Sequence, residues 1–358
     1  MNIENGGGTE RVTSVITNEL VERGYEITII SCQHGNCCKF TLNKKINRHS
    51  LAGEKCGNSF FRKLYVEKQL VKYVKENHID VMIAVDVALY LYLIPLQVRN
   101  LCKCIAWEHF NYYINPNKMV KYARKFAAEH ADCVVVLGKN DLNNYLTHYK
   151  HAKNITYIYN PIAVDATESS PLEHKRAIAV GRLNQQKGFD MLIEAWSQIE
   201  KEVPDWTLDI YGQGPLQETL QNRINELKLE NIKLKGFSED IHREYMNSSL
   251  FFLSSRFEGF VLVLMEAMAT GLPAVSFRCK EGPEETIDDG VNGFLVEEGN
   301  VQQFAECAIK LMKDEKLLKE FAANAKKDLN RFETESIMTQ WMELLNNLYV
   351  QKPYRRKS

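Results

Sequence analysis

Two glutamates eight residues apart, Glu258 and Glu266, lie in the segment whose residue types are best suited to chemistry on a ligand. The apolar run 250–253 predicts a buried strand before them, and residues 262–270 predict a helix that Gly271 stops. Glu258 would then precede the helix, and Glu266 would lie about one turn inside it. In an α/β sheet this places both carboxylates beyond the strand ends, where ligands bind. Carboxylates there can hold the hydroxyls of a sugar or a ribose.

The turn between this strand and helix predicts an anion site. Backbone N–H groups at the start of a helix point toward such a ligand, and the helix dipole favours negative charge there. The donors would come from Gly259, Phe260, Val261 and Leu262. The alternative is structural: Glu258 would cap the helix and Glu266 would lie on its solvated face. The spacing alone does not decide between the two.

A pair of cations, Arg182 and Lys187, follows the predicted strand 176–180, and Gly181 leaves room in the turn. Both side chains could reach one diphosphate. Two fixed cations stabilise the negative charge of a departing nucleoside diphosphate without a metal ion. The chain has no D-x-D triplet, which fits a site without a metal ion. The alternative is an ordinary surface loop that happens to carry two cations.

The first half of the chain offers a histidine and a glycine run. His109 comes two residues after the predicted strand 102–107, so its ring would lie at a strand's carboxyl end. A run of three glycines that includes Gly7 and Gly8 precedes a predicted helix, and would let a diphosphate approach the first turn. A structural histidine and a flexible leader are the respective alternatives.

These residues belong to a regular alternation of short apolar strands and helical stretches, which predicts two doubly wound parallel sheets. The expected strands are 25–31, 81–85, 102–107, 133–137 and 155–159, then 176–180, 206–211, 232–235, 250–253, 273–276 and 293–296. Asn160-Pro161 and the polar stretch after it indicate the linker. We therefore expect domains at 1–161 and 162–334, followed by a last helix at about 335–350.

One element of the first domain is missing from this pattern. A doubly wound domain needs a strand that leads into the helix after Gly8, yet only five residues precede the glycine run. That is too few for a strand of ordinary length. We therefore expect that the N-terminal domain lacks its first strand here, either because the natural chain begins upstream or because this form is truncated.

Residues 258–273 resemble the E-x7-E signature of the retaining glycosyltransferase family 4 almost position by position. Only Val261 departs from it, because Pro, Gly, Ser or Cys is more usual there. Further matches follow in the family's order at 180–183, 187–188, 211–215 and 235–237, and looser ones at 6–11, 107–111 and 160–161. The resemblance implies the GT-B fold, in which two Rossmann-like domains face a central cleft and a C-terminal helix crosses back to the first domain.

The resemblance also implies roles for the candidate residues. Catalysis is expected from His109, Arg182, Lys187 and Glu258. Donor binding is expected from Gly7, Gly8, Gly181, Phe237, Gly259, Phe260, Val261, Leu262 and Glu266. Arg182 and Lys187 would hold the leaving group, Glu258 the sugar hydroxyls and Glu266 the ribose, while Phe237 would place the base unless it is a core aromatic. A front-face route through an oxocarbenium-like state is expected, because the family offers no well-placed carboxylate nucleophile.

The composition is that of a soluble enzyme: 358 residues, of which 45% are hydrophobic, suit two domains. We find no signal peptide and no apolar run of about 18 residues. The nine cysteines lack the paired spacing of a zinc site and are expected to be reduced thiols. A cytoplasmic location follows, and we expect no cofactor besides the nucleotide-sugar substrate.

Charge divides the chain into unequal halves. Residues 1–161 hold 21 Lys and Arg against 14 Asp and Glu, a net charge of +7, whereas the remainder holds 24 against 32, or −8. Basic residues gather at Lys118, Lys121, Arg124 and Lys125 and in the tail at Lys352, Arg355, Arg356 and Lys357. They could meet anionic lipid at the inner face of the membrane or an anionic acceptor, with solvated surface charge as the alternative. No aromatic-interleaved basic motif indicates nucleic acid.

The stretch 281–287 resembles a subset of the family that includes users of UDP-linked hexoses, which favours UDP without determining the sugar. The expected reaction is transfer of a sugar from a nucleotide diphosphate donor to a glycan or lipid-linked acceptor in cell-surface polysaccharide biosynthesis. Three alternatives are open: a nucleotide-sugar epimerase of the same fold, a glycan phosphorylase, and a nucleotide-sugar-binding protein without catalysis.

Overall fold

The structure is a computed structural model that describes residues 7–32, 39–53, 59–113, 117–162, 168–279, 282–327 and 329–350; of residues 59 and 60 only the backbone is described. The chain forms two compact units. The first unit comprises Met1–Pro161 together with Phe332–Ser358, and the second comprises Ile162–Arg331. Among the residues described, no helix is both long and apolar enough to cross a membrane.

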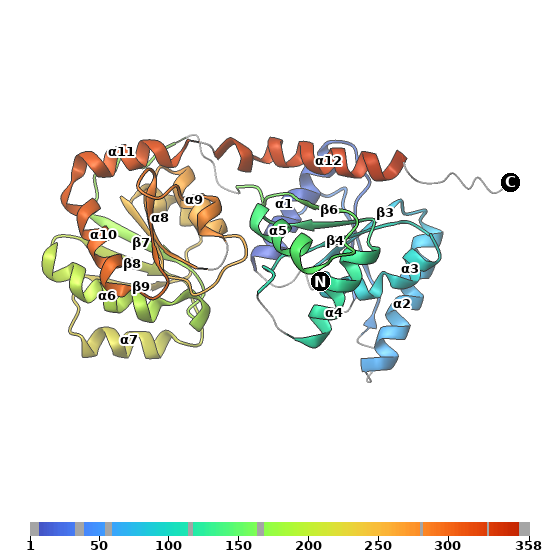
Figure 1. Ribbon diagram of the computed structural model, residues 1–358, viewed down its shortest axis with the longest axis horizontal. Coiled ribbons are helices and arrows are strands. Elements are labelled where there is room, and N and C mark those ends of the chain that lie inside the picture. The colour runs from blue at the N-terminus through green and yellow to red at the C-terminus, as the bar shows by residue number, and fades with distance from the viewer. Residues whose placement is uncertain are drawn as a thin grey trace. The chain divides into compact units, whose positions relative to one another are not determined.

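The second unit is built on a six-stranded parallel sheet in the order β12-β11-β10-β7-β8-β9, of which Figure 1 labels β7, β8 and β9. Its strands are β7 (Arg176–Val180), β8 (Thr207–Tyr211), β9 (Ile232–Gly236), β10 (Leu250–Leu253), β11 (Ala274–Arg278) and β12 (Gly293–Glu297). The chain runs outward from β7 to β9 and then returns to place β10 on the other side of β7. The strand order therefore reverses between β7 and β10, which is where doubly wound sheets bind ligands.

Helices cover both faces of this sheet. They are α6 (Phe189–Glu202), α7 (Gln217–Glu226), α8 (Ile241–Met246), α9 (Leu262–Ala269), α10 (Val301–Lys313) and α11 (Glu315–Ala325), with 3₁₀ turns η3 (Gln185–Lys187), η4 (Pro283–Glu285) and η5 (Leu329–Phe332). Phe252 of β10 packs against Phe304 of α10, while its neighbour Phe251 packs against Tyr245 of α8. Because successive strand residues point to opposite faces, the run Leu250–Leu253 is buried throughout.

The first unit contains two parallel sheets. β3 (Val81–Val85), β4 (Lys103–Trp107), β5 (Cys133–Val136) and β6 (Ile155–Tyr157) pair in that order, and β1 (Thr28–Ser31) pairs separately with β2 (Asn47–Ser50). The helices are α1 (Gly8–Glu22), α2 (Ser59–Glu76), η2 (Val87–Tyr92), α3 (Ile94–Val98), α4 (Lys118–His130), α5 (Lys139–His148) and α12 (Thr334–Val350).

The predicted parallel α/β sheets are confirmed, and each of the eleven expected strands overlaps an observed one. β2 was not predicted, because Asn47–Ser50 contains no apolar residue and is largely exposed. Among the described residues only Gly7 precedes α1. The expected loss of a first strand concerns residues 1–5, which lie outside the described part of the chain.

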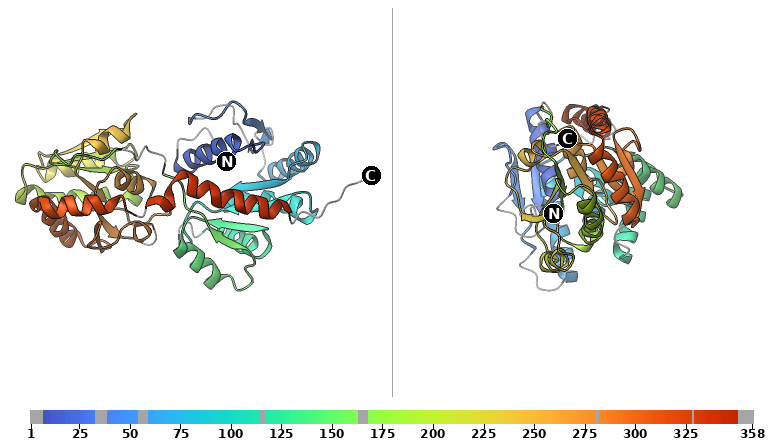
Figure 2. Two further views of the ribbon diagram at one scale, coloured as in Figure 1. Left: turned by 90° about the horizontal axis from the view of Figure 1, so that it is seen from above. Right: turned by 90° about the vertical axis from the view of Figure 1, so that its left-hand side faces the viewer.

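The last helix, α12, packs on the first unit as expected. Its Trp341 is buried, and the ring centroid lies 4.9 Å from that of Trp107 at the end of β4. Figure 2 shows α12 in red beside the dark blue α1, and Arg23 after α1 pairs with Glu335 at the start of α12. The apolar face of a helix that follows the second unit thus completes the core of the first.

Candidate active site

The loops at the carboxyl ends of β7, β8 and β10 are joined by close backbone packing that only glycine permits. A Cβ at Gly212, after β8, would lie 1.9 Å from the carbonyl oxygen of Gly181, after β7. A Cβ at Gly188 would lie 2.0 Å from the carbonyl oxygen of Ser254, and Gly188 also has a φ of +62°. Any larger residue would push these loops apart. The glycines therefore hold the candidate residues of the second unit at one edge of the sheet.

Lys187 and Glu258 meet at this edge although 71 residues separate them in the chain. The Lys187 Nζ donates to Glu258 Oε1 at 2.6 Å, and Ser255 Oγ donates to the same oxygen. Glu258 is 5% exposed, whereas 17% of the Lys187 side chain faces solvent. Lys187 and Glu258, which the sequence predicts as separate ligand-binding groups, are thus in direct contact with each other.

Arg182 lies in the same loop as Lys187, and Phe237 follows the edge strand β9; both side chains are exposed. Arg182 is exposed and makes no side-chain hydrogen bond or ion pair with any described residue. Phe237 follows Gly236 at the end of β9 and is 74% exposed, so it is not the core aromatic that was its alternative. A free guanidinium can bind phosphate, and an exposed ring can stack on a base.

The helix that follows Glu258 begins where the sequence predicted. Val261 occupies the N-cap position of α9, and its buried side chain lies 2.7 Å from the place that a Cβ on Gly282 would take. Leu262 N–H donates to the carbonyl of Phe260 at 3.1 Å, so this one of the four expected anion donors is already used. Glu266 is 1% exposed and points into the protein, so the alternative of a solvated helix glutamate is wrong.

His109 lies in the first unit, two residues beyond β4, and is 8% exposed. Its ring centroid is 4.3 Å from that of Trp107, and no described residue forms a hydrogen bond with its Nε2. Burial lowers the pKa of His109 to about 3, because the apolar surroundings disfavour the charged ring. The ring is therefore neutral at physiological pH and can offer a nitrogen to a ligand.

Glu108, beside His109, is engaged in an ion pair that the sequence did not predict. Arg124 Nε donates to Glu108 Oε2 at 2.7 Å, with 2% and 1% of the two side chains exposed. Burial raises the pKa of Glu108 to about 7 against the lowering effect of Arg124. The sequence predicts a basic surface cluster of Arg124 with Lys118, Lys121 and Lys125. That assignment is wrong, because Arg124 faces the interior while the three lysines are exposed.

Gly7 and Gly8 are placed at the start of α1, as predicted, with Gly7 as the N-cap. A carboxylate oxygen of Glu10 lies 2.7 Å from the position of a Cβ on Gly7, so a side chain there would collide with it. Gly6 lies outside the described residues. The Glu10 carboxylate occupies the space over this helix end and opposes a second anion there.

The structure adds contacts between the loops after β7 and β10 that the sequence did not suggest. Arg256 donates through two nitrogens to the carboxylate of Asp190, and its backbone N–H donates to the carbonyl of Gln186. Ser254 Oγ donates to the carbonyl of Lys187 at 2.8 Å. Asp190 lies in the first turn of α6, three residues after Lys187, but nothing in its type or spacing indicates a partner 66 positions away.

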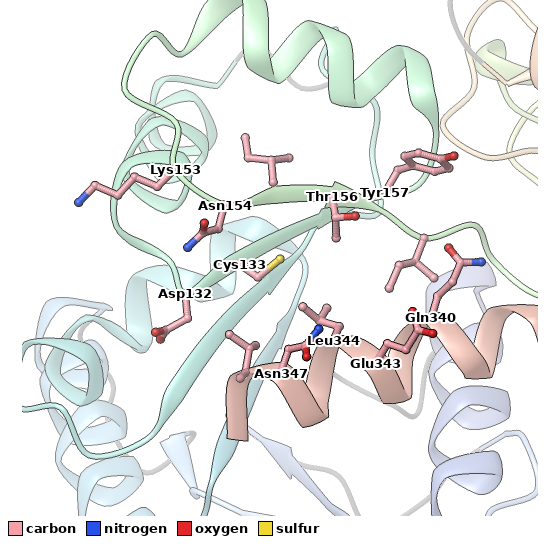
Figure 3. A pocket seen from close by; sticks show the side chains of 13 residues that line it. Asp132, Cys133, Lys153, Asn154, Thr156, Tyr157, Gln340, Glu343, Leu344 and Asn347 are labelled. Atoms are coloured by element: carbon pink, nitrogen blue, oxygen red, sulfur yellow. The ribbon is translucent and has the colours of Figure 1, made fainter. Parts of the chain in front are cut away.

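A cavity of about 550 Å³ lies elsewhere, in the first unit between α12 and the strands β5 and β6 (Figure 3). Asp132 and Asn154 stand at the amino ends of these two strands, and Glu343 and Asn347 reach it from α12. None of the predicted site residues lines it. Ligands of parallel α/β sheets bind at the carboxyl ends of the strands, so we do not assign the reaction to this cavity.

Comparison with known proteins identifies the family. A model for Glycosyl transferases group 1 matches residues 164–328, and one for Glycosyltransferase Family 4 matches residues 6–166. An uncharacterised glycosyltransferase of Haemophilus influenzae is 32% identical over 349 residues, which cover 96% of this chain and 98% of that protein. The amylovoran biosynthesis glycosyltransferase AmsD of Erwinia amylovora is 30% identical over 362 residues, which cover 96% of this chain and 97% of AmsD.

The chain therefore belongs to glycosyltransferase family 4. It is a glycosyltransferase that uses a nucleotide-sugar donor. HepE of Anabaena, solved in complex with UDP, has the same GT-B fold: the TM-score is 0.83 at 21% identity, over 97% of this chain and 98% of HepE. The sucrose-phosphate synthase of Thermosynechococcus elongatus matches with a TM-score of 0.82 at 16% identity, over 96% and 94% of the two chains.

Proposed function

We propose that this protein is a retaining hexosyltransferase that moves a sugar from a UDP-sugar to a glycan or lipid-linked acceptor in cell-surface polysaccharide biosynthesis. The observation that carries the proposal is the contact between Lys187 and Glu258, in a site whose β7 loop also carries the exposed Arg182. A cation and a carboxylate in contact can bind the two parts of a nucleotide sugar on either side of the bond that breaks. The cation would bind the diphosphate, and the carboxylate would bind the sugar hydroxyls. The resemblance to AmsD, a protein named for amylovoran biosynthesis, supports the polysaccharide context.

UDP is the proposed nucleotide because two similar structures contain it. HepE was solved with UDP, and so was a TarM variant of Staphylococcus aureus, which matches with a TM-score of 0.70 at 25% identity over 78% of this chain and 59% of TarM. The buried carboxylate of Glu266 would bind the ribose, and Phe237 would stack on the uracil. The main-chain N–H groups of Gly259, Phe260 and Val261 would hold a phosphate.

The proposed reaction proceeds on one face of the sugar. The bond from the anomeric carbon to the β-phosphate oxygen breaks, while Arg182 and Lys187 stabilise the charge that collects on the diphosphate. The acceptor hydroxyl attacks the same face, and its proton passes to the departing phosphate oxygen. Glu258 holds sugar hydroxyls, and neutral His109 accepts or donates one hydrogen bond near the reacting carbon. Glu108 cannot act as a nucleophile in this scheme, because Arg124 and Tyr145 both donate to it.

Contact with a membrane surface is part of the proposal. The exposed face of α4 carries Lys118, Lys121 and Lys125, and the exposed apolar side chains of Met119 and Tyr122 lie between them. Lysines of this kind are attracted to anionic lipid, and an aromatic ring suits the headgroup level. The basic tail after Val350 lies outside the described residues. We propose a cytoplasmic location with peripheral binding at the inner face of the membrane.

The proposal is tested by titrating UDP, GDP and ADP sugars calorimetrically into the protein, with EDTA present. We expect selective, EDTA-insensitive binding of one UDP-sugar that Lys187→Ala loses. Lys313→Ala, which removes an exposed lysine paired with Glu202, is the matched control and should bind normally. Absence of binding by every sugar nucleotide would contradict the donor site. Rearrangement of the bound donor without an acceptor would instead favour the nucleotide-sugar epimerase.

A further inference from the structure

Side-chain hydrogen bonds hold the backbone of the loop that carries His109. We call residues Glu108–Tyr113 the His109 loop. Its Phe110 N–H donates to Glu108 Oε1 at 3.1 Å, and its Tyr113 N–H donates to Asn111 Oδ1 at 2.9 Å. From α5, Asp141 Oδ1 accepts the Tyr112 N–H at 2.8 Å. Side chains therefore supply the hydrogen-bond partners that backbone groups find in a sheet or a helix, and these bonds fix the conformation of the loop.

Arg124 of α4 makes the largest contribution to this network. Its Nε donates to Glu108 Oε2 at 2.7 Å, one terminal nitrogen donates to the carbonyl of Tyr112 at 2.7 Å, and the other donates to the carbonyl of Asn111 at 2.9 Å. One rigid, planar group thus fixes the residue before His109 and two residues after it. A lysine would keep the charge but has a single nitrogen on a flexible stem, so it cannot reach three such acceptors in the same geometry.

The other side of Glu108 is closed by α5. Tyr145 O–H donates to Glu108 Oε2 at 3.1 Å, and the Tyr145 side chain is fully buried. Glu108 thus accepts hydrogen bonds from Arg124, Tyr145 and the Phe110 N–H of its own loop. These donors surround the carboxylate and leave no space beside it for a substrate. Two helices and the loop are connected through one carboxylate, which makes the loop geometry depend on both helices.

His109 is the exception within this saturated network. Its ring lies against Trp107, and Nε2 has no hydrogen-bond partner among the described residues although the side chain is 92% buried. A buried polar atom without a partner costs free energy, and such atoms cluster at functional sites. The bonds around His109 therefore keep one nitrogen in place and unused, which is what a ligand-binding group needs.

We propose that Arg124 is a positioning residue: it holds the His109 loop so that the imidazole of His109 is presented to the substrate in one orientation. Arg124 itself is 2% exposed, so its side chain offers almost no surface for contact with a substrate. The inference rests on the proposed function for what His109 does, but the positioning itself is a property of the first unit alone. It can therefore be measured without any substrate.

The direct test is the NMR signal of the His109 ring in the protein labelled with ¹³C at histidine. The chain has nine histidines, and the His109 signal is the one that disappears in His109→Gln. Packing against Trp107 displaces this signal from the position of an exposed histidine. In Arg124→Lys we expect it to move toward that exposed position or to broaden. An unchanged His109 signal in a folded Arg124→Lys protein would overturn the proposal.

The matched control is Arg176→Lys. Arg176 also bonds several groups, namely Asp209, Tyr211 and Glu244, but it belongs to the second unit. We expect Arg176→Lys to leave the His109 signal unchanged. If Arg176→Lys displaces the signal as much as Arg124→Lys does, the signal reports a general loss of rigidity in the protein. That result would also overturn the proposal. If Arg124→Lys does not fold, Tyr145→Phe removes a single bond to Glu108 and should displace the signal in the same direction by less.

Kinetics then separate positioning from donor binding. If a UDP-sugar is confirmed as donor, Arg124→Lys should lower kcat at least tenfold and leave the donor KM within about twofold, because the donor contacts lie in the second unit. If kcat and the fraction of folded protein fall by the same factor, Arg124 has only a structural role. If no donor is found, the proposed function fails, while the NMR result still decides whether Arg124 positions His109.

Discussion

Each unit holds a buried glutamate against a cation, and the two pairs differ in what they leave free. Glu108 and Arg124 are 1% and 2% exposed, and every guanidinium nitrogen of Arg124 is used inside the first unit. Lys187 keeps 17% of its side chain in solvent, and the free guanidinium of Arg182 lies in the same loop. A saturated pair stabilises architecture, whereas a pair with an accessible cation can exchange partners with a ligand.

The largest effect should come from breaking the saturated pair. Arg124→Met would leave the Glu108 carboxylate buried without its cation, and removing one partner of such a pair costs about 3–5 kcal/mol. We expect the free energy of unfolding of the first unit to fall by up to that amount in urea titrations at pH 9. The fall should be smaller at pH 7, because Glu108, whose pKa burial already raises to about 7, can take up a proton there. The double variant Arg124→Met with Glu108→Leu should recover part of the loss. If the single variant is as stable as the original protein, the pair is not structural.

The accessible pair should respond in the opposite way, with a large loss of activity and a small loss of stability. Lys187→Ala and Glu258→Ala should each lower kcat by at least about 100-fold, the scale of losing an electrostatic contact to the transition state. Initial rates with the donor found by titration measure this, and melting temperatures check that folding is kept. Near-normal rates in both variants would contradict the assignment of the site.

The difference between the Glu108–Arg124 pair and the Glu258–Lys187 pair could be predicted only in part from the sequence. The strands, α9 with its Gly271 stop, and the loops that bring Lys187 to Glu258 follow from apolar runs, turn residues and family motifs. The burial of Arg124 could have been found, because it shares the 3.6-residue period of the buried Val120, Ala123 and Ala127. Its partner Glu108 could not, since that contact depends on how α4 packs against the end of β4.

Other features were beyond sequence reasoning for stated physical reasons. β2 is polar and exposed, so neither period nor hydrophobicity distinguishes Asn47–Ser50 from a loop; only its pairing with β1 defines it. Asp190 pairs with Arg256, 66 positions away, which only the fold brings to it. Ser255 donates to Glu258 only three positions further on, but a serine hydroxyl in a turn has many possible partners. Hydroxyl and carboxylate side chains of this kind occur on most surface turns, so their type carries no signal until the loops are placed.

His109 gives a pH dependence of stability that belongs to the first unit. Its pKa is lowered to about 3 in the folded protein from an ordinary 6.5, so the unfolded chain binds the extra proton first. This stability is complete above pH 6.5 and is lost as the pH falls from there toward 3. Between pH 7 and pH 5 the loss is about 2 kcal/mol. We expect His109→Gln to remove that part of the pH dependence in chemical denaturation, whereas Lys187→Ala should keep it.

The smallest effect concerns the exposed ring near the accessible pair. Phe237 is 74% exposed and packs little against the protein, so Phe237→Ala should leave the melting temperature unchanged. Loss of base stacking on an exposed ring costs about 1 kcal/mol, which would raise the donor KM about fivefold and leave kcat nearly unchanged. Phe237→Tyr retains the stacking face and should bind the donor normally. A contact with the base is equally strong in the bound state and in the transition state, so its loss changes KM and not kcat. A drop in kcat without a change in KM would therefore show that the ring contacts the transferred sugar or the acceptor and not the base.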